Sequence, residues 1–154
     1  MRALEPASLK LRIPATAAEA YLLRRRLRIW LDEAGVSPDE AFEIVTAVSE
    51  AFINAVEHAQ DPTSPQVDVK AEVIDHQLTL AVHDHGAWRI EPRRPGGYGL
   101  LLMRTFMSAV EVHSATGSTT VTMRRELRVP DEESSERERP RAAKPVPVAG
   151  ELEA

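Results

Sequence analysis

The amino-acid sequence predicts an α+β fold, a two-layer sandwich in which a mixed, mostly antiparallel sheet carries helices on one face. The first observation is that short segments with alternating apolar residues occur as neighbouring pairs, which is typical of β-hairpins. The second is that two longer segments with helical periodicity precede these pairs. The third is the expected order of strand, helix, helix, strand, strand, helix, strand and strand, which suits a sheet with one helical layer.

The N-terminal part is expected to hold one strand and one helix. Apolar and charged side chains alternate over residues 9–13, as in a half-buried strand, and Pro14 ends the pattern. Thr16 is a suitable N-cap for a helix over residues 17–34, and Gly35 follows the last helical residue.

A second helix is expected over residues 38–60 and is the longest predicted element. Its start, residues 37–40, combines a serine cap, a proline at the first helical position and two acidic residues, all of which favour a helix N-terminus. Residues 61–65 include two prolines, so the helix cannot continue through them.

Two hairpins are expected in the second half of the chain, each formed by alternating segments around a short polar turn. The predicted strands cover residues 67–73, 78–82, 110–112 and 119–123. The predicted turns lie at Asp75-His76 and near Thr116-Gly117-Ser118. Between the hairpins, a helix of about eight residues is expected to begin at Gly99.

The composition restricts the class of protein. A chain of 154 residues suits one domain, and a net charge of -5 argues against direct binding of nucleic acid. Cysteine is absent, which excludes disulfides, thiolate metal sites and cysteine nucleophiles. No apolar segment approaches the ~20 residues that a membrane-spanning helix needs, and the N-terminus does not resemble a signal peptide. We therefore expect a cytoplasmic protein without a membrane partner.

The composition changes near the end of the chain. Residues 130–154 contain four prolines, seven acidic and four basic residues, and little that could be buried. Such a segment cannot offset the entropy lost on ordering. We expect a domain over residues 1–128 and a disordered, acidic and proline-rich tail over residues 129–154.

Three polar residues of the long predicted helix share one side. Glu50, Asn54 and His58 are spaced at i, i+4 and i+8. The amide oxygen of Asn54 can bind a hard cation that already carries phosphate oxygens, and the carboxylate of Glu50 can accept a proton nearby. A solvated helix face is the alternative explanation, and His58 alone also suits the C-terminal end of a helix.

Further residues are typical of a nucleotide site. Asp84 follows a strand, where a partly desolvated carboxylate can accept a hydrogen bond from an exocyclic amine, and Gly86 would let a flat ring approach the backbone. Gly97 and Gly99 precede a helix, whose exposed amides can bind phosphate. Thr119 offers a hydroxyl at the start of a strand. A turn, a hinge and ordinary strand propensity are the simpler alternatives for these residues.

In this order the motifs resemble the ATP site of the GHKL superfamily, which includes gyrase, histidine kinases and the heat-shock chaperone ATPase. The resemblance covers roughly residues 8–127, and it implies a Bergerat-type ATP-binding fold. The segment Gly-Tyr-Gly-Leu-Leu-Leu-Met at residues 97–103 looks most like the anti-sigma-factor serine kinases of bacteria.

The resemblance implies a role for each motif. Asn54 would bind Mg²⁺ together with the nucleotide phosphates, and Glu50 would be the general base that acts on a serine hydroxyl. Asp84 would bind the adenine amine. The remaining implied members of the ATP site are His58, Gly86, Gly97, Gly99, Leu100 and Thr119.

The activity implied by the resemblance is that of an ATP-binding anti-sigma factor. Such a protein is also a serine kinase that phosphorylates an anti-sigma-factor antagonist of the STAS type, sequesters a sigma factor, and can form a homodimer. Two alternatives remain open at the level of sequence. One is a non-catalytic ATP-binding regulatory module, and the other is an α/β interaction domain without a nucleotide.

Overall fold

A computed structural model describes residues 4, 6–60, 66–85, 87–88, 98–115 and 117–129. The helices of this part are α1 (Ala20–Glu33), α2 (Pro38–His58) and α3 (Gly99–Phe106), with a 3-10 turn, η1 (Ala17–Glu19), before α1. The strands of the main sheet are β1 (Ala7–Pro14), β3 (Gln66–Ile74), β4 (Gln77–Asp84), β6 (Ala109–Ala115) and β7 (Ser118–Glu126). A separate short pair is formed by β2 (Ala59–Gln60) and β5 (Ala87–Trp88).

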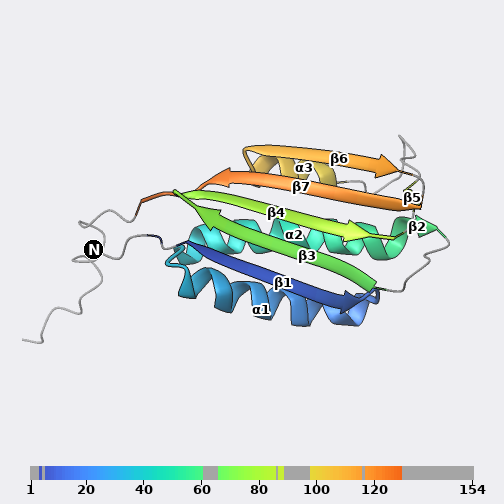
Figure 1. The fold of residues 1–154 in the computed structure, drawn as a ribbon, viewed down its shortest axis with the longest axis horizontal. Coiled ribbons are helices and arrows are strands. Elements are labelled where there is room, and N and C mark those ends of the chain that lie inside the picture. Colours follow the sequence, from blue (N-terminus) through green and yellow to red (C-terminus); the bar gives the residue numbers. More distant parts are fainter. Residues whose placement is uncertain are drawn as a thin grey trace, which may run out of the picture.

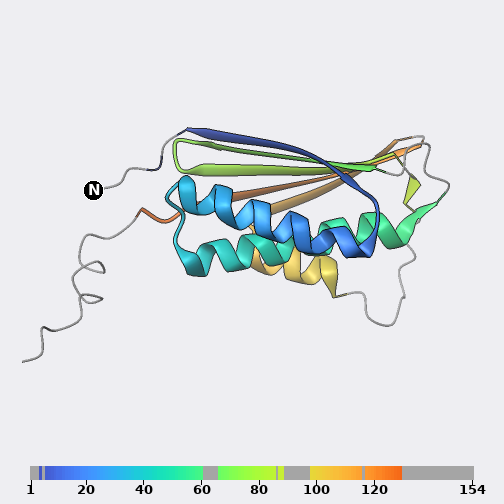
Figure 2. The same ribbon diagram turned by 90° about the horizontal axis from the view of Figure 1, so that it is seen from below.

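The main sheet has five strands in the order β1-β3-β4-β7-β6 (Figure 1). All its neighbouring strands pair antiparallel. The helices α1, α2 and α3 lie together on one face of the sheet, as Figure 2 shows from the side. The predicted α+β class and the two predicted hairpins, β3–β4 and β6–β7, are confirmed.

The core lies between the sheet and the helical layer. Inward side chains alternate with outward ones along the strands, so every second residue of β3, β4 and β7 is buried against the helices. Fully buried members of this core include Ile44, Val48, Ala51 and Phe52 of α2 and Val67, Val69, Leu80 and Val121 of the strands.

The turn between β3 and β4 is set by two residues with positive φ angles. Asp75 has φ 48° and His76 has φ 65°. Two consecutive residues in the left-handed region form the type I′ turn that joins two-residue hairpins, because its twist matches that of the strands. The predicted turn at Asp75-His76 is therefore confirmed.

The starts of the first two helices differ in how they are capped. The hydroxyl of Thr16 makes no capping hydrogen bond, and the 3-10 turn η1 comes before α1, so the predicted side-chain cap is wrong. The backbone carbonyl of Thr16 instead accepts the N–H of Glu19 at 3.1 Å. Before α2, the Oγ of Ser37 accepts the N–H of Glu40 at 3.4 Å, as its position predicts.

Helix α2 ends at His58, earlier than predicted. Ala59 and Gln60 leave the helix and pair antiparallel with Trp88 and Ala87. Their backbone hydrogen bonds therefore go to another segment rather than to a further helical turn. The sequence contains no breaker between His58 and Pro62, so periodicity alone could not locate this end.

Residues 130–154 lie outside the described residues, so the domain boundary after residue 128 and the disordered tail stay predictions. Within the described part of the chain, none of the helices is long and apolar enough to cross a membrane.

Candidate functional site

The predicted site residues that the structure describes lie toward one end of the sandwich. The C-terminal half of α2 carries Glu50 and Asn54, and β4 ends at Asp84. In Figure 1 the end of β4 lies by the C-terminal end of α2, next to the short pair β2–β5. The start of α3 contacts α2 in the same region, through Gly99.

Gly99 brings the first turn of α3 into direct contact with α2. A Cβ atom built on Gly99 would lie 3.0 Å from Oε2 of Glu50 and 3.2 Å from Nδ2 of Asn54. Both distances are shorter than ordinary van der Waals contact, so a larger residue would push these two side chains aside. Gly99 is not among the glycines with positive φ, which means that space and not backbone conformation favours glycine here.

Glu50 and Asn54 project from the same side of α2, one turn apart, as their spacing predicts. Both residues are half-buried. A carboxylate and an amide oxygen therefore lie side by side, at the start of another helix. This arrangement can bind a cation and accept a proton at the same place.

The first turn of α3 is suited to a negative charge. Helix α3 has no acidic residue in its first turn, and its N-cap residue, Tyr98, makes no side-chain capping bond. The amides at a helix start carry the positive end of the helix dipole, and they bind phosphate when it approaches. Leu100, the second residue of α3, is half-buried.

Asp84 and Thr119 face each other on the inner side of the sheet. They are register partners of β4 and β7, and they are 3% and 1% exposed. The Oγ of Ser114 lies 3.3 Å from Oγ1 of Thr119. Because Asp84 follows Val82 in the alternation that buries β4, its side chain faces the helical layer that carries Asn54.

Three predicted site residues lie wholly or partly outside the described part of the chain. Gly86 and Gly97 lie outside the described residues. His58 is the last residue of α2, and its side chain also lies outside the described part. The roles of these three residues, and those of the other predicted site residues, stay predictions.

The opposite face of the same sheet end carries a polar cluster that the sequence did not reveal. Nε of Arg12 donates to Oδ1 of Asp68 at 2.8 Å, and Nε2 of His85 lies 3.6 Å from Oδ2 of Asp68. The hydrogen bond from Arg12 lowers the pKa of Asp68 below its ordinary value, and it raises the pKa of Arg12. Nδ1 of His83 lies 2.7 Å from Oγ1 of Thr120. This cluster faces away from Glu50 and Asn54, so it is separate from the candidate site.

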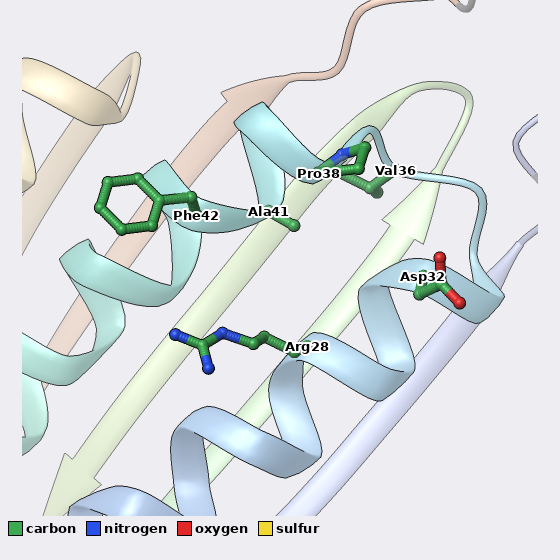
Figure 3. A pocket seen from close by; sticks show the side chains of 6 residues that line it. All are labelled: Arg28, Asp32, Val36, Pro38, Ala41 and Phe42. Atoms are coloured by element: carbon green, nitrogen blue, oxygen red, sulfur yellow. The ribbon is translucent and has the colours of Figure 1, made fainter. Parts of the chain in front are cut away.

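A hollow of about 360 Å³ lies between α1 and the first turn of α2 (Figure 3). It is at the opposite end of α2 from Asn54, so it is not part of the predicted nucleotide site. Its lining residues are Arg28, Asp32, Val36, Pro38, Ala41 and Phe42.

The fold agrees with that of a histidine kinase-like ATPase domain. The chain belongs to this family, because the model of the histidine kinase-like ATPase domain matches residues 13–125. The resemblance identified from the motifs is thereby confirmed, and so is the α+β architecture that it implies.

Individual relatives are similar to the chain over most of the domain. The serine-protein kinase RsbW of Staphylococcus epidermidis is 29% identical over 130 residues, which covers 72% of this chain and 82% of the relative. The anti-sigma F factor of Caldanaerobacter subterraneus subsp. tengcongensis is 32% identical over 97 residues, covering 54% of this chain and 67% of the relative.

A solved structure is similar in fold as well as in sequence. It contains the RsbU and RsbW domains of a Mycobacterium tuberculosis protein, at 30% identity and a TM-score of 0.67. The match covers 80% of this chain and spans 33% of that longer chain.

Proposed function

We propose that this protein is an ATP-binding anti-sigma factor and a protein serine kinase. It phosphorylates an anti-sigma-factor antagonist and sequesters a sigma factor. The contact of Gly99 with Glu50 and Asn54 carries this proposal, because it places a helix start, an amide and a carboxylate at one point. Membership of the ATPase family and the names of two relatives, a serine-protein kinase and an anti-sigma F factor, support it.

The phosphates of ATP bind at the start of α3. Gly99 has no side chain between the first turn of α3 and the side chains of Glu50 and Asn54, so phosphate oxygens bound by the first-turn amides would lie beside both residues. Gly97 is assigned to the same role, and Leu100 and His58 complete this end of the site.

The residues present also fit Mg²⁺. In the described residues no group of three or more histidine, aspartate and glutamate side chains gathers to hold a metal, so an ion at Asn54 takes its other ligands from phosphate and water. Asn54 is the protein ligand, through its amide oxygen. When bound, Mg²⁺ neutralises negative charge on the phosphates.

The adenine ring binds at the end of β4. Asp84 is buried, so its carboxylate can accept a hydrogen bond from the exocyclic amine with little competition from water. Thr119 lies opposite Asp84 and supports this end of the site, and we assign Gly86 to the adenine end as well. The site therefore runs from β4 and β7 to the start of α3.

Glu50 is the general base of the transfer. Its carboxylate accepts the proton of a serine hydroxyl while the serine oxygen forms a bond to the γ-phosphorus of ATP. The bond between that phosphorus and the β–γ bridging oxygen breaks, which leaves ADP and a phosphoserine. Asn54 and the amides of α3 hold the phosphates in place throughout, so the chain contributes positioning and one proton transfer.

The partners follow from the same proposal. The phosphate acceptor is an antagonist of the STAS type, the sequestered protein is a sigma factor, and two copies of this chain form a homodimer. A net charge of -5 agrees with a protein that binds other proteins and not nucleic acid directly. The site of action is the cytoplasm, and the ATP-binding domain ends at residue 128.

Transfer of labelled phosphate from ATP to a purified antagonist tests the proposal. The wild-type protein should phosphorylate a serine of the antagonist. Glu50→Gln should bind ATP with unchanged affinity and transfer phosphate about 10²–10⁴-fold more slowly, because it lacks the base. Glu33→Gln, at an exposed position of α1, is the matched control and should behave as the wild type.

Equal transfer by Glu50→Gln and wild type would reject Glu50 as the base. ATP binding without transfer to any antagonist tested would favour a non-catalytic ATP-binding regulatory module. Failure of the wild-type protein to bind ATP would reject the proposal as a whole.

A further inference from the structure

A buried ion-pair cluster lies at the end of α2 that is remote from the ATP site. Arg125 is on the inner side of β7, and its side chain is 8% exposed. Its Nη2 donates to Oε1 of Glu40 at 3.1 Å, and its Nη1 donates to Oε2 of Glu43 at 2.5 Å. Glu40, in the first turn of α2, is 1% exposed. None of these residues belongs to the proposed ATP site.

The same guanidinium also holds the end of α3. Nη1 of Arg125 donates to the carbonyl oxygen of Phe106, the last residue of α3, at 2.9 Å. The last carbonyls of a helix have no N–H donor within it, and they carry the negative end of the dipole. Arg125 supplies both a donor and a positive charge at that point. One side chain thereby joins β7, α2 and α3.

Helix α3 runs antiparallel to α2, so its two ends meet two different parts of α2 (Figure 2). Its first residue, Gly99, contacts Glu50 and Asn54, whereas Phe106 lies by the cluster at Glu40 and Glu43. The helix has 8 residues, or about 12 Å. A helix this short is not stable alone, so its position depends on its tertiary contacts, which include the buried Met103 and the contacts at its two ends.

The cluster contributes more by its geometry, which orients α3, than by its charges, which add little stability. A buried ion pair gains little net stability, because both partners lose their hydration, and apolar residues of similar size often do as well. The guanidinium, however, is a rigid planar fork whose donors point in fixed directions. Its value at this position is the fixed orientation of α3 on α2.

We propose that Arg125 is a positioning residue for the ATP site. By holding Phe106 against the first turn of α2, it sets where the start of α3 lies relative to Glu50 and Asn54. The amides that bind phosphate therefore depend on a residue at the other end of the helix. This inference rests on the proposed function.

The test compares Arg125→Met, Arg125→Lys and the double variant Glu40→Met/Arg125→Met in the full-length protein. The readouts are KM for ATP and kcat of phosphate transfer, with amide hydrogen exchange of α3 against that of β3. Leu27→Ala is the control, because Leu27 is buried on α1, which lies at the opposite edge of the helical layer from α3 (Figure 1). It should lower stability without affecting KM for ATP.

A positioning role predicts that Arg125→Met raises KM for ATP about tenfold and speeds amide exchange in α3 but not in β3. Partial unfolding would instead lower kcat at unchanged KM, because fewer molecules would be active. Arg125→Lys keeps a donor for Phe106, so it should restore part of the lost affinity. The double variant should regain stability, since it leaves no unpaired buried charge at Glu40, but KM should stay raised.

Recovery of both stability and KM in the double variant would overturn the inference, and so would an unchanged KM in Arg125→Met. If the wild-type protein does not bind ATP, the proposed function fails. In that case the exchange of α3 amides still decides whether Arg125 fixes this helix. Equal protection of the α3 amides from exchange in Arg125→Met and wild type would reject the positioning role of Arg125.

Discussion

Gly99 and Glu50 are in such close contact that a single methyl group on Gly99 would reach the carboxylate. The Cβ position of Gly99 is 3.0 Å from Oε2 of Glu50. The first turn of α3 therefore rests directly on the residue that we propose as the base.

The first prediction concerns Gly99→Ala. The methyl group would displace the ends of the Glu50 and Asn54 side chains and so disturb the proposed phosphate site. We expect at least a tenfold loss of ATP affinity with little loss of stability, because helix propensity favours alanine by up to about 1 kcal/mol. Titration with ATP and thermal unfolding measure the two effects separately.

Gly35→Ala is the control for this substitution. Gly35 lies between α1 and α2, away from the site, and has φ +88°, a conformation that costs alanine roughly 1–2 kcal/mol. It should therefore show the opposite result, with lower stability and unchanged ATP affinity. Unchanged affinity in Gly99→Ala would mean that the phosphates do not bind at the start of α3.

The second prediction concerns Asp84→Asn. A buried carboxylate that accepts a hydrogen bond from adenine contributes about 1.5–3 kcal/mol, so the variant should bind ATP and ADP roughly 10–100-fold more weakly. Competition with a fluorescent adenine nucleotide measures this loss. Asp68→Asn, on the outer face of the same sheet end, is the matched control and should bind as the wild type. Equal affinities of Asp84→Asn and wild type would place adenine elsewhere.

The third prediction concerns stability against pH. Arg12 lowers the pKa of Asp68 in the folded protein below the ordinary value of about 3.9. The stability that this carboxylate contributes is complete above pH ~4 and is lost as pH falls through the lowered pKa. Urea denaturation should therefore show Asp68→Asn less stable than wild type at pH 7 and nearly equal to it in acid, below the lowered pKa of Asp68. A difference that persists in acid would show that the ionised pair is not its cause.

The elements that the sequence predicted well are those whose signals are local. The turn at Asp75-His76 lies between two alternating segments, and Ser37 with Pro38 begins α2 at the expected residue. The spacing of Glu50 and Asn54 was sufficient to place both on one side of α2. Each of these predictions needed only a few neighbouring residues.

The features that were missed depend on distant residues. The early end of α2 follows from pairing with Trp88, and the missing Thr16 cap reflects a backbone turn that propensity does not encode. The role of Arg125 requires α2 and α3 to meet beside β7. One signal was present, however: the alternation through Val121 placed this arginine on the buried face of the strand.

The last prediction concerns Asn54, where the proposed metal and phosphate interactions meet. Its amide oxygen is the proposed protein ligand of Mg²⁺. In Asn54→Ala the ion has no protein ligand at that position, so ATP should bind no more tightly with Mg²⁺ than without it. The side chain lies on α2 next to Gly99, so its loss should leave the fold unchanged.

Calorimetric titration of the wild-type protein and Asn54→Ala with ATP, each with and without Mg²⁺, tests the central claim most directly. The account predicts that Mg²⁺ tightens binding of ATP to the wild-type protein and has no such effect on Asn54→Ala. Binding of Mg²⁺ and ATP to Asn54→Ala with wild-type affinity would contradict it.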